Sequence, residues 1–362
     1  MLDRRTFTAL LFAAPAFPQD SKSAPALSWH DVHQFSLEGK AWADTKAPFD
    51  RLPAKAEGIV RKAVWDLSRR SAGMCVRFIA DATAIHARWT LLSPALALVT
   101  MPATGVSGLD LYARTDAGRW RWVGIGRPAT YPTSTAVIGN GIAPGKREYM
   151  LYLPLYNGVT SVEIGVPEGS PISKAPARER SRKPILFYGT SITQGAAASR
   201  PGMCHPAILG RRFDREVINL GFSGNGKMEP EIARLLAELD PAVYILDCLP
   251  NMTAQEVEER AEGFVRILRE ARPTHPILLV EDRSYTDGFY ITSRRRRNET
   301  SRAAFQAVFK KLTRDKVPHL HYLAGESLLG DDGEASIDGS HPTDLGFVRQ
   351  ADQFEKALRK ML

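Results

Sequence analysis

In the C-terminal half of the chain, short apolar runs alternate with amphipathic helical patterns, and this alternation constrains the fold most. The apolar runs cover 185–188, 217–220, 243–246, 277–280 and 320–323. Apolar residues at helical spacing cover 232–239, 257–268, 305–312 and 347–358. Strands buried on both faces are continuously apolar, and parallel strands need helical crossovers between them. The pattern therefore predicts an α/β domain over 184–362, in which helices cover both faces of a parallel sheet.

The N-terminal half shows a different pattern, in which polar and apolar residues alternate over short stretches. These stretches cover 75–79, 84–89, 120–123, 150–153 and 162–166. Period-two alternation is typical of half-buried antiparallel strands, and several such strands at short spacing favour a sandwich. We therefore expect an antiparallel β-sandwich over 28–167, with no helix beyond short turns. The stretch 168–183 is rich in Pro, Ser and basic residues, which predicts a linker.

The first 19 residues have the layout of an export signal. Arg4 and Arg5 precede an apolar stretch from Phe7 to Phe17, and small residues at 13–16 offer a cleavage region. This order predicts a secretory signal peptide over 1–19, and the arginine pair resembles a twin-arginine signal. The alternative is a disordered tail with a chance arginine pair. The signal predicts a periplasmic or secreted protein. No uncharged apolar run approaches the roughly 20 residues that span a bilayer, so we expect no membrane anchor.

Composition excludes several classes of protein. Of the 362 residues, 44% are hydrophobic, which is too many for a disordered chain. The three cysteines are far apart and include no Cys-x-x-Cys pair, which argues against a disulfide framework and a structural zinc site. The net charge of +8 raises nucleic acids or anionic glycans as partners. The basic run 294–297 is expected on a solvated loop. Because no nucleic-acid-binding motif accompanies it, we expect no nucleic-acid partner.

Residues that carry chemistry follow the predicted parallel strands. Ligands of open parallel sheets bind beyond the carboxyl ends of the strands. The loops at these ends contain Ser191, Gly224, Asn251 and Glu281, and the segment before the last helix contains Asp338 and His341. Together they supply a hydroxyl, a glycine loop, a carboxamide, a carboxylate and a histidine. These are the parts of an acyl-transfer site.

The roles of these residues follow from their chemistry. A serine hydroxyl needs a base to remove its proton, and His341 is the only histidine in these five loops. Asp338 lies three residues before His341, close enough to fix its tautomer. An oxyanion hole then needs donors, for which the backbone N–H groups of Ser191 and Gly224 and the side chain of Asn251 are candidates. No cofactor is needed, and no metal-ligand cluster is apparent.

Each element also has a simpler interpretation. Ser191 could cap a helix, the glycine loop could be a plain turn or hold a phosphate, and Asn251 could cap a helix that begins near Thr253. Asp338 could bind a backbone turn while His341 packs beside Pro342. Each simple interpretation is the more common one when taken singly. The convergence of several independent loops on one sheet edge favours the catalytic interpretation.

Four segments resemble the conserved blocks of the SGNH hydrolases, also called GDSL-type esterases. The segments are Gly189-Thr190-Ser191, Ser223-Gly224-Asn225, Asn251 and Asp338-Gly339-Ser340-His341-Pro342, within 183–362. In addition, Gly108-Leu109-Asp110-Leu111-Tyr112 resembles the Gly-x-Asp-Leu-Tyr motif of a β-sandwich fused to one SGNH branch. The resemblance implies a three-layer α/β/α, flavodoxin-like domain, with Ser191, Asp338 and His341 as a triad and Gly224 and Asn251 as oxyanion donors. It also implies similarity to carbohydrate acetylesterases.

Two departures from the family pattern leave the substrate preference open. Thr190 stands where many SGNH hydrolases have Asp, and Leu249-Pro250-Asn251-Met252 replaces the usual Gly-x-Asn-Asp. We expect a serine esterase that removes short acyl groups, most simply acetyl, from carbohydrate. The alternatives are a non-catalytic secreted glycan-binding protein, and an SGNH lipase or thioesterase with a non-carbohydrate substrate.

Several further residues are candidates for substrate contacts. Arg200 and His205 follow the serine loop, and Glu281 follows the fourth predicted strand. Trp65, Trp89, Trp120 and Trp122 could bind sugars, or they could belong to the core of the sandwich.

Overall fold

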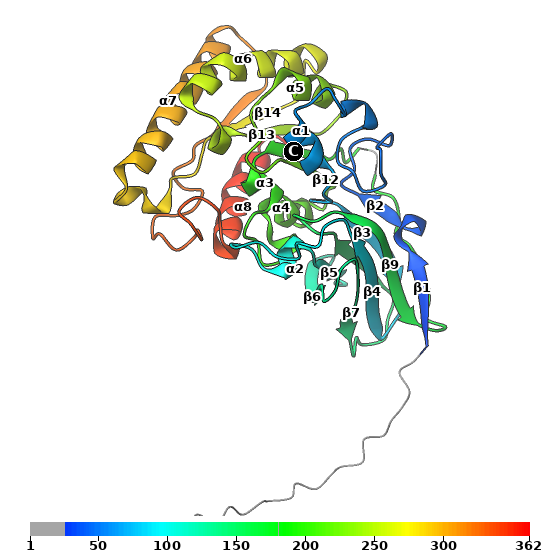
Figure 1. Cartoon of the computed structure of the whole chain (residues 1–362). Coiled ribbons are helices and arrows are strands. Elements are labelled where there is room, and N and C mark those ends of the chain that lie inside the picture. The colour runs from blue at the N-terminus through cyan, green and yellow to red at the C-terminus, as the bar shows by residue number, and fades with distance from the viewer. Residues whose placement is uncertain (1–25, 180) are drawn as a thin grey trace, which may run out of the picture.

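The computed structural model describes residues 26–179 and 181–362. The predicted signal peptide at 1–19 lies outside the described residues. Figure 1 shows two parts, a β-rich N-terminal part and an α/β C-terminal part packed against it. Within the described ranges, no helix has the length and apolar character needed to cross a membrane.

The N-terminal part is an antiparallel β-sandwich, as predicted. Its strands are β1 (Leu27–Asp31), β2 (Ser36–Glu38), β3 (Cys75–Ala80), β4 (Ala84–Leu91), β5 (Leu109–Arg114), β6 (Trp120–Gly126), β7 (Thr133–Asn140), β8 (Arg147–Tyr152), β9 (Val159–Pro167) and β10 (Ile172–Lys174). One sheet has the order β1-β9-β4-β7, and the other has the order β10-β3-β8-β5-β6, with β2 also paired to β3. The alternating apolar residues point between the two sheets, where Phe78, Trp89 and Leu151 are fully buried.

The N-terminal part contains short helices and one strand that the sequence pattern does not predict. The helical segments are η1 (Val32–Gln34), η2 (Ala54–Ala56), α1 (Lys62–Ser68) and α2 (Ala103–Val106). The seven-residue α1 buries Val64, Trp65 and Leu67, a spacing of apolar residues that places them on one helical face. The predicted linker 168–183 contains β10, which pairs with β3. The polar composition of this stretch concealed an edge strand of three residues.

The C-terminal part is an α/β domain with a five-stranded parallel sheet, as predicted. The strands are β11 (Ile185–Gly189), β12 (Val217–Gly221), β13 (Val243–Asp247), β14 (Ile277–Val280) and β15 (Leu320–Leu323). The helical segments are α3 (Ser191–Gln194), η3 (Pro201–Met203), α4 (His205–Phe213), α5 (Pro230–Ala237), η4 (Leu249–Asn251), α6 (Ala254–Ala271), η5 (Thr286–Phe289), α7 (Thr292–Arg314) and α8 (Asp344–Leu358). The strand order β12-β11-β13-β14-β15 places the first strand between the second and the third. The carboxyl end of β11 is therefore the topological switch point, where ligands of such sheets bind.

Helices cover both faces of this sheet and make it a three-layer structure (Figure 1). On one face, Tyr188 of β11 stacks on Phe264 of α6, and α5 and α7 complete the layer. On the other face, Phe187 of β11 packs against Phe354 of α8, beside α4. Successive residues of β11 thus point into opposite cores, as period-two geometry requires.

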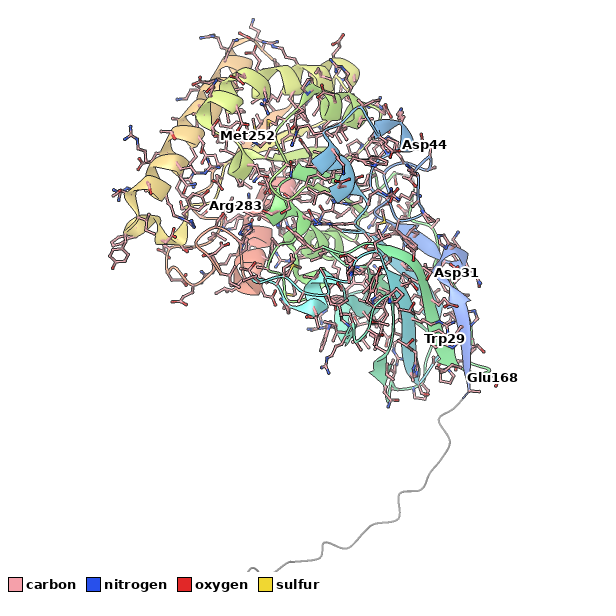
Figure 2. The ribbon with its side chains drawn as sticks, in the orientation of Figure 1. Trp29, Asp31, Asp44, Glu168, Met252 and Arg283 are labelled. Atoms are coloured by element: carbon pink, nitrogen blue, oxygen red, sulfur yellow. The ribbon has the colours of Figure 1, made fainter. Side chains whose placement is uncertain are left out.

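The two parts of the chain share their hydrophobic cores. Trp42 and Trp65, from the N-terminal part, lie in the same core as α5 and α6. Met150 and Tyr152 of β8 pack with α4 and the opposite face of the parallel sheet. Figure 2 shows Asp44 beside the α/β domain, whereas Trp29 and Glu168 lie at the outer edge of the sandwich. The sandwich is therefore packed against the domain whose strand ends carry the candidate chemistry.

Candidate active site

The candidate nucleophile lies at the start of a single helical turn. β11 ends at Gly189, Thr190 caps α3 by accepting the N–H of Ile192 through Oγ1 at 3.3 Å, and the helix begins at Ser191. A Cβ at position 189 would lie 2.2 Å from Thr193 Oγ1, so only glycine fits between strand and helix. This sharp turn holds Ser191, which is only 6% exposed, at the switch point of the sheet.

Ser191, His341 and Asp338 form one hydrogen-bonded chain, although 150 residues separate the first two along the sequence. Ser191 Oγ lies 2.9 Å from His341 Nε2, and His341 Nδ1 lies 2.7 Å from Asp338 Oδ2. The other oxygen of Asp338 accepts the backbone N–H of His341 at 2.8 Å. The carboxylate therefore holds both the backbone and the ring of the histidine.

The charge of Asp338 fixes the proton on the ring. Partial burial acts to raise the pKa of this carboxyl group, but the hydrogen bonds from His341 and the Ser340 amide outweigh it, so the pKa lies below its usual value. An ionised Asp338 accepts a hydrogen bond from the Nδ1–H group, so the proton stays on Nδ1 and Nε2 is left as the acceptor that faces Ser191. This is the tautomer that removes a proton from a serine hydroxyl.

Three hydrogen-bond donors near Ser191 lack an acceptor among residues 26–179 and 181–362. They are the backbone N–H groups of Ser191 and Gly224 and the side-chain amide of Asn251. Gly224 is exposed with φ +70°, a conformation that favours glycine. Asn251 Oδ1 accepts the N–H of Gly226 at 3.2 Å, and a Cβ at Gly226 would lie 2.3 Å from Gly189 O. The glycine loop, the asparagine and the serine turn are therefore in close contact.

Two arginines of the basic run bind the backbone of segments that carry the candidate site. The run lies in the first turns of α7, so the predicted solvated loop is wrong. Arg294 donates to the carbonyl of Asp338 at 2.6 Å, and Arg297 donates to the carbonyl of Pro250 at 2.7 Å. At a spacing of three residues the two side chains share a helical face. The sequence shows the basic run, but it does not show that the run binds the carbonyls of Asp338 and Pro250.

A buried ion pair that the sequence pattern does not predict lies beneath the nucleophile turn. Arg283 and Asp247 are 1% or less exposed and pair through two hydrogen bonds, one of them 2.8 Å long. Asp247 also accepts the hydroxyl of Thr193 in α3 at 2.8 Å, and Arg283 donates to Gln350 of α8 at 2.6 Å. Figure 2 shows Arg283 in the interior of the α/β domain. The pair therefore links the sheet to α3 and α8, the two helices that flank the site.

Arg200 connects the two parts of the chain. It donates to Asp110 Oδ2 at 2.8 Å and to the hydroxyl of Tyr112. Asp110 and Tyr112 are the polar residues of the Gly-x-Asp-Leu-Tyr motif, so the motif ties the sandwich to the loop after α3. Because its guanidinium is engaged in these contacts, Arg200 is a structural residue in this conformation.

His205 and Glu281, the other two predicted substrate contacts, are fully buried. The ring of His205 stacks between Phe347 and Phe354, and burial lowers its pKa well below the usual value. Glu281 accepts hydrogen bonds from Gln306, Tyr322 and Gly325. Both residues follow strand or loop ends, as predicted, but their side chains point into the core, out of reach of a substrate.

The tryptophans divide between core and surface. Trp65 and Trp89 are buried, so their expected role as sugar platforms is not available to them. Trp122 is 51% exposed, but it donates to Asp110 and lies under the Arg200 guanidinium. Over the described part of the chain, no group of three His, Cys, Asp or Glu side chains is arranged to hold a metal ion.

Comparison with known proteins agrees with this architecture. The GDSL-like lipase/acylhydrolase family matches residues 182–359, and the N-terminal domain of SGNH-type esterases matches residues 27–172. The comparison with curated proteins gives no significant match. Among solved structures, a protein from Bacteroides ovatus described as a GDSL-like lipase is 34% identical over 93% of this chain and 98% of its own, with a TM-score of 0.88.

More distant structures share the fold. The salicylyl-acyltransferase SsfX3 from a tetracycline biosynthetic pathway is 18% identical over 94% of this chain and 96% of its own, with a TM-score of 0.70. An acetyl xylan esterase from Butyrivibrio proteoclasticus is 9% identical over 92% of this chain and 98% of its own, with a TM-score of 0.58. On the similarity to the Bacteroides ovatus protein and the two family matches, the chain belongs to the GDSL-like lipase/acylhydrolase family and is a carboxylic ester hydrolase with the N-terminal domain of SGNH-type esterases.

Proposed function

We propose that the protein is a serine esterase that removes short acyl groups, most simply acetyl, from carbohydrates. The observation that carries the proposal is the hydrogen-bonded chain from Ser191 through His341 to Asp338. Such a chain, next to donors that have no acceptor, is suited to acyl transfer. A glycan-binding protein without activity would have no use for this arrangement.

The proposed mechanism has two half-reactions. Ser191 Oγ attacks the ester carbonyl carbon while His341 Nε2 takes the hydroxyl proton, and ionised Asp338 stabilises the imidazolium. The oxyanion is stabilised by the N–H groups of Ser191 and Gly224 and by the Asn251 amide. When the tetrahedral intermediate collapses, the C–O bond to the alcohol breaks and His341 protonates the leaving oxygen. Water, deprotonated by His341, then attacks the acyl carbon of the acyl-enzyme. The bond from this carbon to Ser191 Oγ breaks, His341 returns the proton to Oγ, and the acid is released.

The carbohydrate part of the proposal has separate support. Two structural neighbours are carbohydrate esterases, the Butyrivibrio acetyl xylan esterase and a family two carbohydrate esterase from Clostridium thermocellum in complex with cellohexaose. Their identity to this chain is low, so they support the fold and suggest the substrate class. An exported enzyme would meet such polymers outside the cell.

The substrate class can be tested by measuring acid release. Purified protein is incubated with 4-nitrophenyl acetate, butyrate and octanoate, and with acetylated xylan, pectin and chitin fragments. We expect kcat/KM to fall as the acyl chain lengthens, and acetate to be released from at least one glycan. Preference for octanoate, or hydrolysis of simple esters without release from any glycan, would contradict the acetyl or the carbohydrate part, respectively.

A further inference from the structure

A cavity of about 240 Å³ lies between α1 and the loops of the sandwich. Its wall includes Asp66, Arg69, Arg70, Leu98, Tyr156 and Asn157. It is slightly smaller than the roughly 300–1,000 Å³ pockets that hold whole drug-sized ligands. The cavity therefore has room for one substituent of a substrate.

This cavity is one side chain away from the nucleophile. Tyr156 lines it, and the hydroxyl of the same tyrosine donates to the backbone carbonyl of Ser191 at 3.3 Å. The Arg70 guanidinium lies over the Tyr156 ring, 5.6 Å from the ring centre. The Tyr156 side chain therefore contacts both the Arg70 guanidinium and the backbone of the Ser191 turn.

Arg70 is the one charged group of this wall without a partner among the described residues. Arg69 pairs with Asp50 at 2.7 Å, and Asp66 pairs with Lys62 at 2.6 Å. The polar atoms of the Asn157 side chain bond to Ser93 and Ser107. The Arg70 side chain makes no hydrogen bond or ion pair to any residue of 26–179 or 181–362.

Tyr156 does not neutralise this charge. Burial raises the pKa of its hydroxyl to about 12, so the ring is neutral near pH 7. The Asp66 carboxylate of the same wall attracts the Arg70 charge, but it pairs with Lys62 and makes no hydrogen bond to Arg70. A partly buried guanidinium that no carboxylate bonds has lost hydration that a bound carboxylate would replace, through two parallel hydrogen bonds in the best geometry. The cavity is therefore preorganised for an anion.

We propose that Arg70 binds a carboxylate on the alcohol side of the ester, such as the one a uronic acid unit carries. This proposal rests on the proposed esterase function and names its substrate class. An acetyl group is small and uncharged, so a negative charge in the substrate belongs to the alcohol. The enzyme would then prefer acetylated acidic glycans to neutral ones, and Arg70 would be a specificity-determining residue.

The test compares acetate release from two aryl acetates that differ by one methyl group and one charge, anionic 4-acetoxybenzoate and its neutral methyl ester. Arg70→Gln removes the charge, Arg70→Lys retains it, and Arg119→Gln makes the same charge change on an exposed turn of the sandwich. We expect Arg70→Gln to lower kcat/KM for the anionic ester about 10- to 100-fold relative to the methyl ester, mainly through KM. Arg70→Lys should restore part of the preference, and Arg119→Gln should leave it unchanged.

An equal loss of kcat/KM for both esters, or no loss for either, would overturn the role of Arg70 while leaving the esterase function intact.

A second readout, binding, does not depend on turnover. In Ser191→Ala protein, calorimetry should show tighter binding of 4-acetoxybenzoate than of its methyl ester, and adding Arg70→Gln should remove the difference. Equal binding of the two esters by the Ser191→Ala protein would refute the anion site. Absence of hydrolysis of both esters by the wild-type protein would instead refute the proposed function.

Discussion

Replacing Arg283 by methionine tests whether the buried ion pair beneath the nucleophile turn holds the site together. The guanidinium pairs with Asp247 through two hydrogen bonds, and both side chains are essentially without exposed surface. Methionine fills much of the same volume but carries no charge. The Arg283→Met variant therefore leaves the Asp247 carboxylate buried, with the hydroxyl of Thr193 as its one remaining side-chain hydrogen-bond donor in the described structure.

The expected loss of stability is large for a single substitution. Removing one partner of a buried ion pair costs about 3–5 kcal/mol, because the other charge remains desolvated and unpaired. The carboxamide of Gln350, which now accepts from Arg283 at 2.6 Å, also loses a donor. Adding Asp247→Asn to Arg283→Met removes the stranded charge. We therefore expect the double variant to be more stable than Arg283→Met alone.

Urea unfolding followed by tryptophan fluorescence and circular dichroism measures both effects. A loss of less than about 1 kcal/mol for Arg283→Met would refute the reasoning, because it would place the pair among weakly coupled surface charges. Additive effects of Arg283→Met and Asp247→Asn would refute it as well, since contacting partners should couple.

Three further predictions concern the site and its supports. Asn251→Ala should lower kcat about 100-fold or more with little change in KM, because an oxyanion donor acts in the transition state; a pure KM effect would assign Asn251 to substrate binding. Arg294→Ala should lower kcat by loosening the segment that holds Asp338, with partial rescue by Arg294→Lys; unchanged kinetics would remove its positioning role. Burial raises the pKa of Asp282 from 3.8 to about 6. The folded state thus favours protonated Asp282, so stability from this group is present below pH 4 and is lost as pH rises through 6. Asp282→Asn should therefore gain stability over wild type, by at most about 3 kcal/mol, between pH 4 and 7; a constant difference across this range would contradict the assignment.

The parallel sheet was predictable because its strands are buried on both faces. Such strands are unbroken apolar runs, and all five lie where the runs occur. The arrangement of Ser191, Asp338 and His341 was predictable for a related reason, since the fold brings the loops after parallel strands to one edge. Short polar elements were not predictable. β10 in the stretch 168–183 has three residues and too little apolar surface to produce a pattern.

Most of the remaining features that the sequence did not predict involve polar or charged residues in the interior. Arg283 is fully buried, but its sequence neighbours do not distinguish it from a surface arginine. The prediction that Glu281 and His205 contact the substrate was wrong, because a polar residue after a strand or loop can point into the core as well as toward the site. Tyr156 was missed since it comes from the sandwich, and only the packing of the two parts brings it to the backbone of Ser191.

The most direct measurement is covalent labelling of the nucleophile. The protein is treated with phenylmethanesulfonyl fluoride and digested, and the modified peptide is identified by mass spectrometry. We predict a single sulfonylated residue, Ser191, with loss of esterase activity in proportion to labelling, and no labelling when His341 is replaced by alanine. Labelling at another residue, or undiminished hydrolysis of 4-nitrophenyl acetate by a folded Ser191→Ala protein, would contradict the account.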